Sequence, residues 1–254
     1  MLEVRALTKR FSGIPAVDAV SFTARPGEVT GYLGPNGSGK STTVKMITGL
    51  LEPSSGEVLY RGRAISKWLV EYKGLLGYVP EEPYLYGHLT GAEYLELAGR
   101  LHDIPENVLR RKITALLDLF SLASDRHSPL SSYSKGMRQK ILIGAALLHD
   151  PELVILDEPF SGLDAVATMV LRSLIRSLAE TGRTVLFSSH VLEIVEKVCS
   201  RVVILHRGRI VANNSIEELR GLMALPTLEE IFSQLVTETD PELTARRIVE
   251  AIHA

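Results

Sequence analysis

Short apolar stretches alternate with amphipathic stretches along much of the chain. Short, mainly apolar runs, which are typical of buried strands, occupy 29–33, 75–80, 153–156, 184–188 and 202–205. Apolar residues recur with helical spacing in 41–51, 165–179 and 191–198. Strands that alternate with helices predict an α/β protein with a mainly parallel sheet covered on both faces.

The N-terminal region has a different pattern. Within 1–28, apolar and polar positions alternate loosely over 2–7 and again over 17–23, and a turn at 13–15 separates the two segments. A second, shorter hairpin is expected around Gly62. We therefore predict an N-terminal antiparallel β-subdomain beside the parallel sheet.

A helical block interrupts the alternation between residues 84 and 150. Thr90, followed three residues later by Glu93, forms the capping box expected at the start of its first helix. Further helical patterns cover 109–119 and 134–149. We predict an inserted helical subdomain over 84–150.

The remaining residues complete a three-part organisation. A core is expected from 1–83 and 151–220, on either side of the helical subdomain. Residues 221–254 are predicted to form a C-terminal helical extension, with short helices at 227–236 and 240–253 and no clear place in the core.

One glycine-rich segment carries the strongest chemical signal. It fits the phosphate-binding pattern G-x-x-x-x-G-K-[ST], and it follows the apolar run 29–33. Glycines allow backbone N–H groups to approach phosphate oxygens, the lysine reaches the β- and γ-phosphates, and the hydroxyl of Ser41 can ligate Mg²⁺. The next helix would direct its N-terminus at the anion. The predicted nucleotide-binding residues here are Gly34, Pro35, Asn36, Gly37, Ser38, Gly39, Lys40, Ser41 and Thr42.

Two further groups of polar residues follow apolar strands. Asp157 and Glu158 come directly after 153–156, at the end of a strand where open α/β sheets bind ligands. The carboxylate of Asp157 suits binding of Mg²⁺, and the carboxylate of Glu158 suits activation of an attacking water. His190 follows 184–188 and is predicted to bond a γ-phosphate or to orient that water.

Together these motifs resemble those of the ATP-binding subunits of ABC transporters. The resemblance covers roughly residues 2–220 and adds a signature loop at 133–137, a D-loop at 161–164 and a switch histidine at His190. It also places 77–81 where the family has its Q-loop. It implies the ABC ATPase fold, in which a P-loop NTPase core carries both subdomains.

The resemblance also implies roles for residues that the patterns alone do not assign. Phe11 stands at the position that stacks on adenine, and Asp164 belongs to the nucleotide-binding set. Ser134 and Gly136 of one subunit would contact the γ-phosphate of ATP held by another.

Two positions depart from the family pattern. Glu81 stands where the family usually has glutamine, so a third carboxylate is predicted near the metal, where it tightens Mg²⁺ binding or raises a carboxylate pKa. In the signature loop, Tyr133, Lys135 and Met137 replace the usual residues. Both variants resemble subunits that serve exporters.

Composition narrows the range of partners. The chain has 254 residues and a formal charge of −2, which gives no sign of a nucleic-acid surface. Its single cysteine, Cys199, excludes an internal disulfide. No apolar run approaches the ~18 residues of a membrane span, so a membrane role requires a partner.

The resemblance therefore implies an ATPase that uses ATP and Mg²⁺. Two such subunits, here a second copy of the chain, would close on ATP and power export by a separate membrane permease on the cytoplasmic face of the membrane. The alternative is a soluble ABC-type ATPase without a transport role. The chain lacks the heptad run of the DNA-repair members and the second cassette of the translation factors. A further alternative is a P-loop kinase or a GTPase, which would have no use for 134–137 or 161–164. A GTPase should also carry an N-K-x-D segment, which this sequence lacks.

Overall fold

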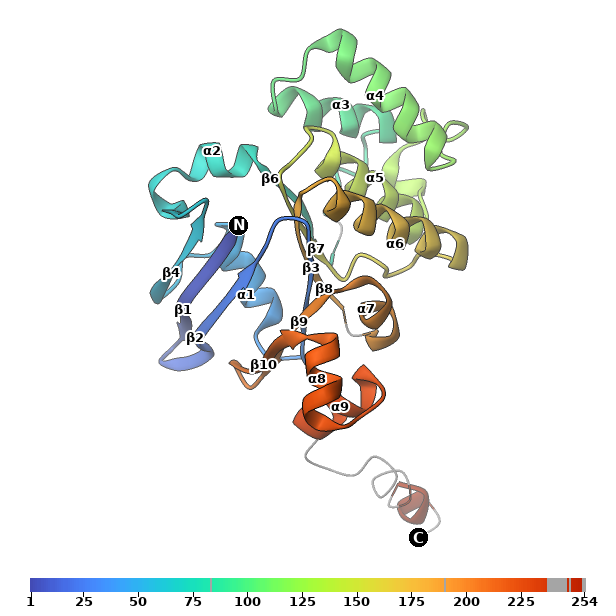
Figure 1. Cartoon of the computed structure of the whole chain (residues 1–254). Helices are drawn as coiled ribbons and strands as arrows, with labels where there is room; N and C mark the ends of the chain where they lie inside the picture. Colours follow the sequence, from blue (N-terminus) through green and yellow to red (C-terminus); the bar gives the residue numbers. More distant parts are fainter. Residues whose placement is uncertain (83, 190, 237–245, 247, 253–254) are drawn as a thin grey trace.

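The protein contains two sheets and a helical lobe (Figure 1). The computed structural model describes residues 1–82, 84–189, 191–236, 246 and 248–252. The antiparallel sheet lies to one side of the mainly parallel sheet, and the helical lobe lies above the latter in this view. This arrangement confirms the predicted α/β fold with its N-terminal antiparallel sheet.

The N-terminal sheet consists of four strands in the order β2-β1-β4-β5. Every neighbouring pair is antiparallel. The strands are β1 (Leu2–Phe11), β2 (Ile14–Ala24), β4 (Ser55–Tyr60) and β5 (Arg63–Ala64). The buried side chains of β1 and β2 face the larger sheet, which explains the loose alternation in the sequence.

The larger sheet has six strands in the order β10-β9-β3-β8-β7-β6. All neighbours are parallel except β10, which is antiparallel to β9. Each residue of β3, β7 and β8 is buried, as expected for central strands covered on both faces. The strands are β3 (Val29–Leu33), β6 (Leu76–Val79), β7 (Leu153–Asp157), β8 (Thr184–Ser188), β9 (Arg201–His206) and β10 (Arg209–Ser215).

The two faces of this sheet have different covers. One face packs against α6 (Ala165–Glu180), α7 (Leu192–Val198) and α9 (Leu228–Val236). The other packs against α1 (Lys40–Ile47) and the antiparallel sheet. A sheet rather than helices therefore covers part of the second face.

The helical lobe has its own core. It is built from α3 (Gly91–Leu101), α4 (Glu106–Leu119) and α5 (Lys135–Leu147), whose fully buried side chains include Leu95, Leu109 and Ile141. The predicted capping box is present, since Thr90 Oγ1 accepts from Glu93 N and Glu93 accepts from Thr90 N.

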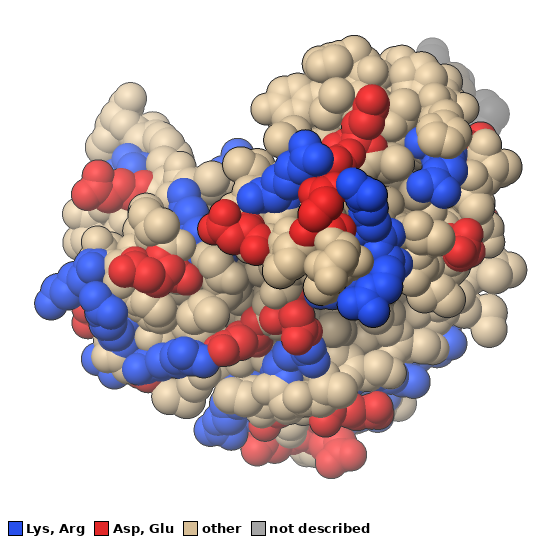
Figure 2. Space-filling model, turned by 90° about the horizontal axis from the view of Figure 1, so that it is seen from above, with Lys and Arg blue, Asp and Glu red and all other residues tan. Residues whose placement is uncertain are grey.

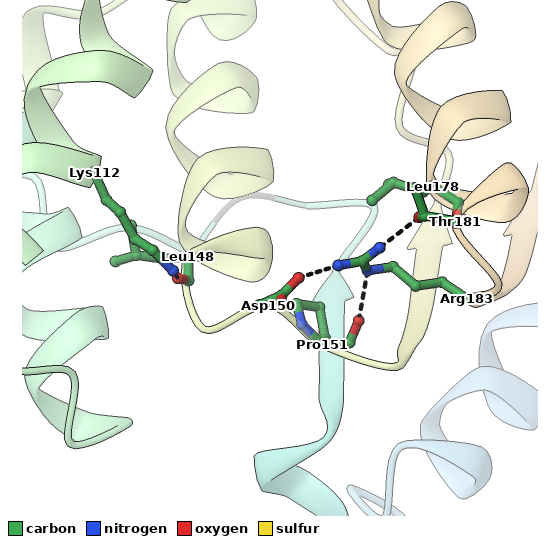
Figure 3. A network of polar contacts seen from close by, with 7 residues as sticks. All are labelled: Lys112, Leu148, Asp150, Pro151, Leu178, Thr181 and Arg183. Carbon is green, nitrogen blue, oxygen red and sulfur yellow. Dashed lines mark hydrogen bonds and ion pairs between the residues drawn. The ribbon is translucent and has the colours of Figure 1, made fainter. Parts of the chain in front are cut away.

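Residues 148–152 lead from the helical lobe back to the core, and we call them the exit strip. Lys112 of α4 donates to the carbonyl of Leu148 at 2.7 Å. Arg183 pairs with Asp150 and donates to the carbonyl of Pro151 at 3.1 Å (Figure 3). Side chains from both the lobe and the core therefore hold the strip.

His149 of the exit strip contacts both the helical lobe, through His102, and strand β6 of the core. The ring of His149 stacks on His102, with centroids 3.7 Å apart and planes 5° apart. Its Nε2 donates to the carbonyl of Leu76 in β6 at 3.2 Å. Burial and the charge of His102 lower the pKa of His149 to about 4.

The C-terminal region corrects one expectation. Leu228 and Ile231 of α9 are fully buried in the core of the larger sheet, so 228–236 does have a place in that core. The second predicted helix, 240–253, lies largely outside the described residues. Two helices were not predicted, α2 (Leu69–Gly74) and α8 (Ile216–Met223).

Candidate functional site

Three buried parallel strands end at one edge of the larger sheet. Tyr32 of β3 and Asp157 of β7 both lie beside Ser188 of β8, so the segments that follow these strands converge. Between them is a cavity of about 580 Å³. It is lined by Ala16, Gly34, Pro35, Asn36, Gly37, Gly39, Lys40, Ser41, Thr42, Glu81, Asp157, Glu158, Ser189, Leu192 and Phe232.

The phosphate-binding loop needs glycine because its own chain packs closely around it. A Cβ on Gly34 would lie 2.3 Å from the carbonyl oxygen of Leu205 in β9. A Cβ on Gly39 would lie 2.5 Å from the carbonyl oxygen of Ala16, and φ there is 106°, in the region that favours glycine. The glycines thus fix the loop against β9 and β2.

Lys40 lies across this loop. Its Nζ donates to the carbonyl of Gly34 at 2.7 Å and to that of Pro35 at 3.2 Å. Burial lowers the pKa of Lys40, while the carboxylates of Glu158, Asp157 and Glu81 oppose that shift. The helix α1 begins at Lys40, so its N-terminal N–H groups also face the cavity.

The carboxylates of Glu81, Asp157 and Glu158 line the cavity together with the loop. Burial raises the pKa of Asp157, and the charges of Glu81 and Glu158 add to the rise, while a hydrogen bond from Ser188 and the charge of Lys40 oppose it. The added carboxylate of Glu81 thus lies close enough to affect Asp157.

Glu158 has an unusual backbone conformation. Its φ is 49°, in the left-handed region, which costs a non-glycine residue about 1–3 kcal/mol and persists only where neighbours enforce it. Its N–H donates to both the carbonyl and the hydroxyl of Ser188, each at 3.2 Å. Strand β8 therefore enforces the turn that carries the acidic pair.

The cavity fits a nucleotide with Mg²⁺. Ser38, a predicted nucleotide contact, is not part of the cavity lining, and its hydroxyl is buried in the loop without a hydrogen-bond partner among the described residues. No group of three His, Cys, Asp or Glu in the described part is arranged to hold a metal alone. Mg²⁺ commonly takes one or two carboxylates and completes its shell with phosphate and water, which agrees with this donor set.

The signature loop lies away from this cavity. Ser134 caps α5 by accepting from Met137 N at 3.2 Å. A Cβ on Gly136 would lie 2.7 Å from the carbonyl oxygen of Gly162, and Lys135 donates to Ser161 at 2.6 Å. The signature loop thus packs against the D-loop, and neither predicted contact, Ser134 nor Gly136, reaches the cavity of its own subunit.

Two other predicted nucleotide contacts also lie outside the lining. Asp164 caps α6 by accepting from Ala167 N at 2.7 Å. Phe11 ends β1, is 49% exposed, and has the ammonium of Lys9 5.6 Å from its ring centroid. His190 lies outside the described residues. The proposed roles of these residues remain predictions.

Sequence reasoning missed several residues that line the cavity. Ala16 comes from β2, Ser189 and Leu192 follow β8, and Phe232 comes from α9. The serine directly before His190 was the one available signal for this group, because it follows a buried strand that ends at the site.

A groove, distinct from the cavity described above, lies between the helical lobe and the core and is lined by residues of both. It has a volume of about 350 Å³, and its aromatic lining includes Tyr78, Tyr94 and Tyr84, of which the last is 84% exposed. His102 and His149 also line it. Figure 2 shows the molecule from above, with acidic and basic side chains interspersed over the face in view. None of the described helices is both long enough and apolar enough to cross a lipid bilayer.

Comparison with known proteins agrees with this geometry. The family model described as ABC transporter matches residues 17–161. An uncharacterised ABC transporter ATP-binding protein of Nostoc sp. is 43% identical over 82% of this chain, and the chain spans 62% of that relative's length. The linearmycin resistance ATP-binding protein LnrL of Bacillus subtilis is 34% identical, covering 99% of this chain and 77% of the relative.

Solved structures are similar as well. The structure of an ATP-binding subunit of an ABC transporter superposes with a TM-score of 0.87 at 35% identity, covering 92% of this chain and 99% of the other. A dimeric bacterial ABC transporter cassette has a TM-score of 0.79 over 85% of this chain and 99% of its own; at 23% identity, this likeness concerns the fold alone. The chain therefore belongs to the ABC transporter family, as one of its ATP-binding cassettes.

Proposed function

We propose that this chain binds and hydrolyses ATP as the energy-supplying subunit of an ABC exporter. The observation that supports this most directly is a cavity whose lining combines the phosphate-binding loop with Glu81, Asp157 and Glu158. Such a combination provides donors for phosphate on one side and acidic groups for metal and water on the other.

The residues of this chain divide the work as follows. The loop N–H groups and Lys40 bind the phosphates, and Ser41 with Asp157 would hold Mg²⁺, which when bound neutralises phosphate charge. Glu158 takes a proton from the water that attacks the terminal phosphorus. The bond from that phosphorus to the bridging oxygen breaks, and ADP and phosphate are released.

A second subunit would complete the site. Ser134 and Gly136 line no part of the cavity in their own subunit, so we assign them to the γ-phosphate of a partner copy. Closure on ATP and release after hydrolysis would then follow from the different affinity of ATP for the two arrangements. The dimeric cassette among the structural relatives has the fold that such a pairing needs.

The groove between the lobe and the core is our candidate for the permease contact. Tyr84 is strongly exposed there and follows Glu81 by three residues, so a helix seated on Tyr84 would lie near the cavity. Such a contact would place the chain at the cytoplasmic face of the membrane. The variant residues Glu81 and Lys135 are the basis for proposing export rather than import.

Substitution of Glu158 tests this function. Glu158→Gln removes the proton acceptor but keeps the shape of the side chain, so phosphate release should fall at least about a hundredfold while ATP still binds. The variant should become dimeric with Mg·ATP in size-exclusion chromatography with light scattering. Lys40→Ala is the matched control, in which both ATP binding and dimer formation should be lost. Near-normal turnover by Glu158→Gln would refute the assignment of the base.

A further inference from the structure

We propose that Ser188 is the positioning residue of this site, because its one hydroxyl sets both Asp157 and the backbone of Glu158. This inference rests on the proposed ATPase function and adds a residue to its machinery. Ser188 is the last residue of β8 and is 1% exposed. It lines no part of the cavity itself, so it acts through the two acidic residues rather than on nucleotide.

The first contact fixes a carboxylate. The hydroxyl of Ser188 donates its proton to Oδ1 of Asp157. The two residues are also direct neighbours in the parallel pairing of β7 and β8, so the contact spans adjacent strand ends. A hydrogen bond to a charged acceptor is stronger than one between neutral groups, and here both Ser188 and Asp157 are buried. The hydrogen bond therefore restricts rotation of the Asp157 carboxylate.

The second contact fixes the turn. The same hydroxyl oxygen accepts from Glu158 N at 3.2 Å, and the carbonyl of Ser188 accepts from that N–H at the same distance. Glu158 needs such support because its φ is 49°. A hydroxyl has one donor and two acceptor positions, so Ser188 can serve both neighbours at once. Alanine at this position would leave the carbonyl bond but remove both hydroxyl contacts.

Removal of the Ser188 hydroxyl should weaken metal binding and slow turnover, but it should not weaken binding of the nucleotide without metal. Loss of a hydrogen bond to a charged group typically weakens the dependent equilibrium by about tenfold or more. Ser188→Ala should therefore lower kcat and weaken metal binding by about tenfold each. The hydrogen bonds of the Ser188 hydroxyl go to Asp157 and Glu158 and not to the phosphate-binding loop, so metal-free ATP affinity should stay within about twofold.

The experiment uses the full chain with three readouts. Mn²⁺ binding is followed by electron paramagnetic resonance with a non-hydrolysable ATP analogue, fluorescent ATP binding is measured in EDTA, and phosphate release gives kcat and KM. Thr184→Ala is the matched control, since Thr184 is equally buried at the other end of β8. It should leave all three unchanged. Ser188→Thr, which keeps the hydroxyl, should recover Mn²⁺ affinity to within about threefold of the wild type.

Several results would overturn the proposal. Wild-type Mn²⁺ affinity and kcat in Ser188→Ala would do so, as would equal losses in Thr184→Ala. If Ser188→Ala does not fold, Ser188→Cys replaces it, because a thiol has similar size but is a weak donor. Cysteine should then bind Mn²⁺ less well than threonine does, and the reverse order refutes the idea. A wild-type protein without ATPase activity would instead refute the proposed function.

Discussion

The burial of Ile231 in α9 leads to a quantitative test of how the C-terminal region belongs to the core. Ile231 is fully buried in the cluster that covers one face of the larger sheet. Truncation of such a side chain to alanine typically costs 2–5 kcal/mol, from lost transfer free energy and the cavity left behind, so Ile231→Ala should cost about 3 kcal/mol. For a chain of this length, that cost corresponds to a fall in Tm of about 6–12 °C.

Differential scanning calorimetry of the nucleotide-free protein measures this shift. Gln234→Ala is the matched control, because Gln234 is exposed on the same helix and its loss should change the unfolding free energy by no more than about 0.5 kcal/mol. A Tm for Ile231→Ala equal to that of the control would show that α9 does not pack in the core. Because the next residue, Phe232, lines the cavity, a true loss of packing should also weaken ATP binding.

Three further predictions concern other parts of the site and its surroundings. Glu81→Gln removes a negative charge beside the metal residues, so half-maximal ATPase activity should require more Mg²⁺; an unchanged Mg²⁺ titration would place Glu81 outside the metal site. Gly136→Ala should lower Tm or disrupt the signature loop, since the new Cβ would meet the carbonyl of Gly162 at 2.7 Å, and a crystal structure with an unmoved loop would contradict this. Because the pKa of His149 in the folded protein is about 4, below that of an unfolded histidine, the unfolded state binds more protons between these values and stability should fall as pH drops from 6.5 to 4. His149→Phe keeps the ring and should show a shallower fall in urea denaturation across that range, whereas equal slopes would exclude His149 as a cause.

The sequence predicted best what depends on local pattern. Mainly apolar runs located β7 and β8, and the glycine-rich motif located the loop, because both signals lie within a few consecutive residues. The packing of α9 could not be predicted in this way, since an amphipathic helix shows that one face is buried but not against what. Ser188 was missed because its role depends on the register of β7 and β8, which brings it beside Asp157. The tight approach of Gly136 to the D-loop likewise depends on tertiary contact.

The two bonds from Lys40 to the carbonyls of Gly34 and Pro35 restrain the phosphate-binding loop from within the loop itself. A preorganised loop saves the entropy that an unstructured loop would lose on binding. Replacement of Lys40 therefore removes a positive charge and also the two hydrogen bonds that brace the loop internally. The affinity lost in such a variant measures the sum of both effects, and a variant that neutralises the charge while keeping the brace is needed to separate them.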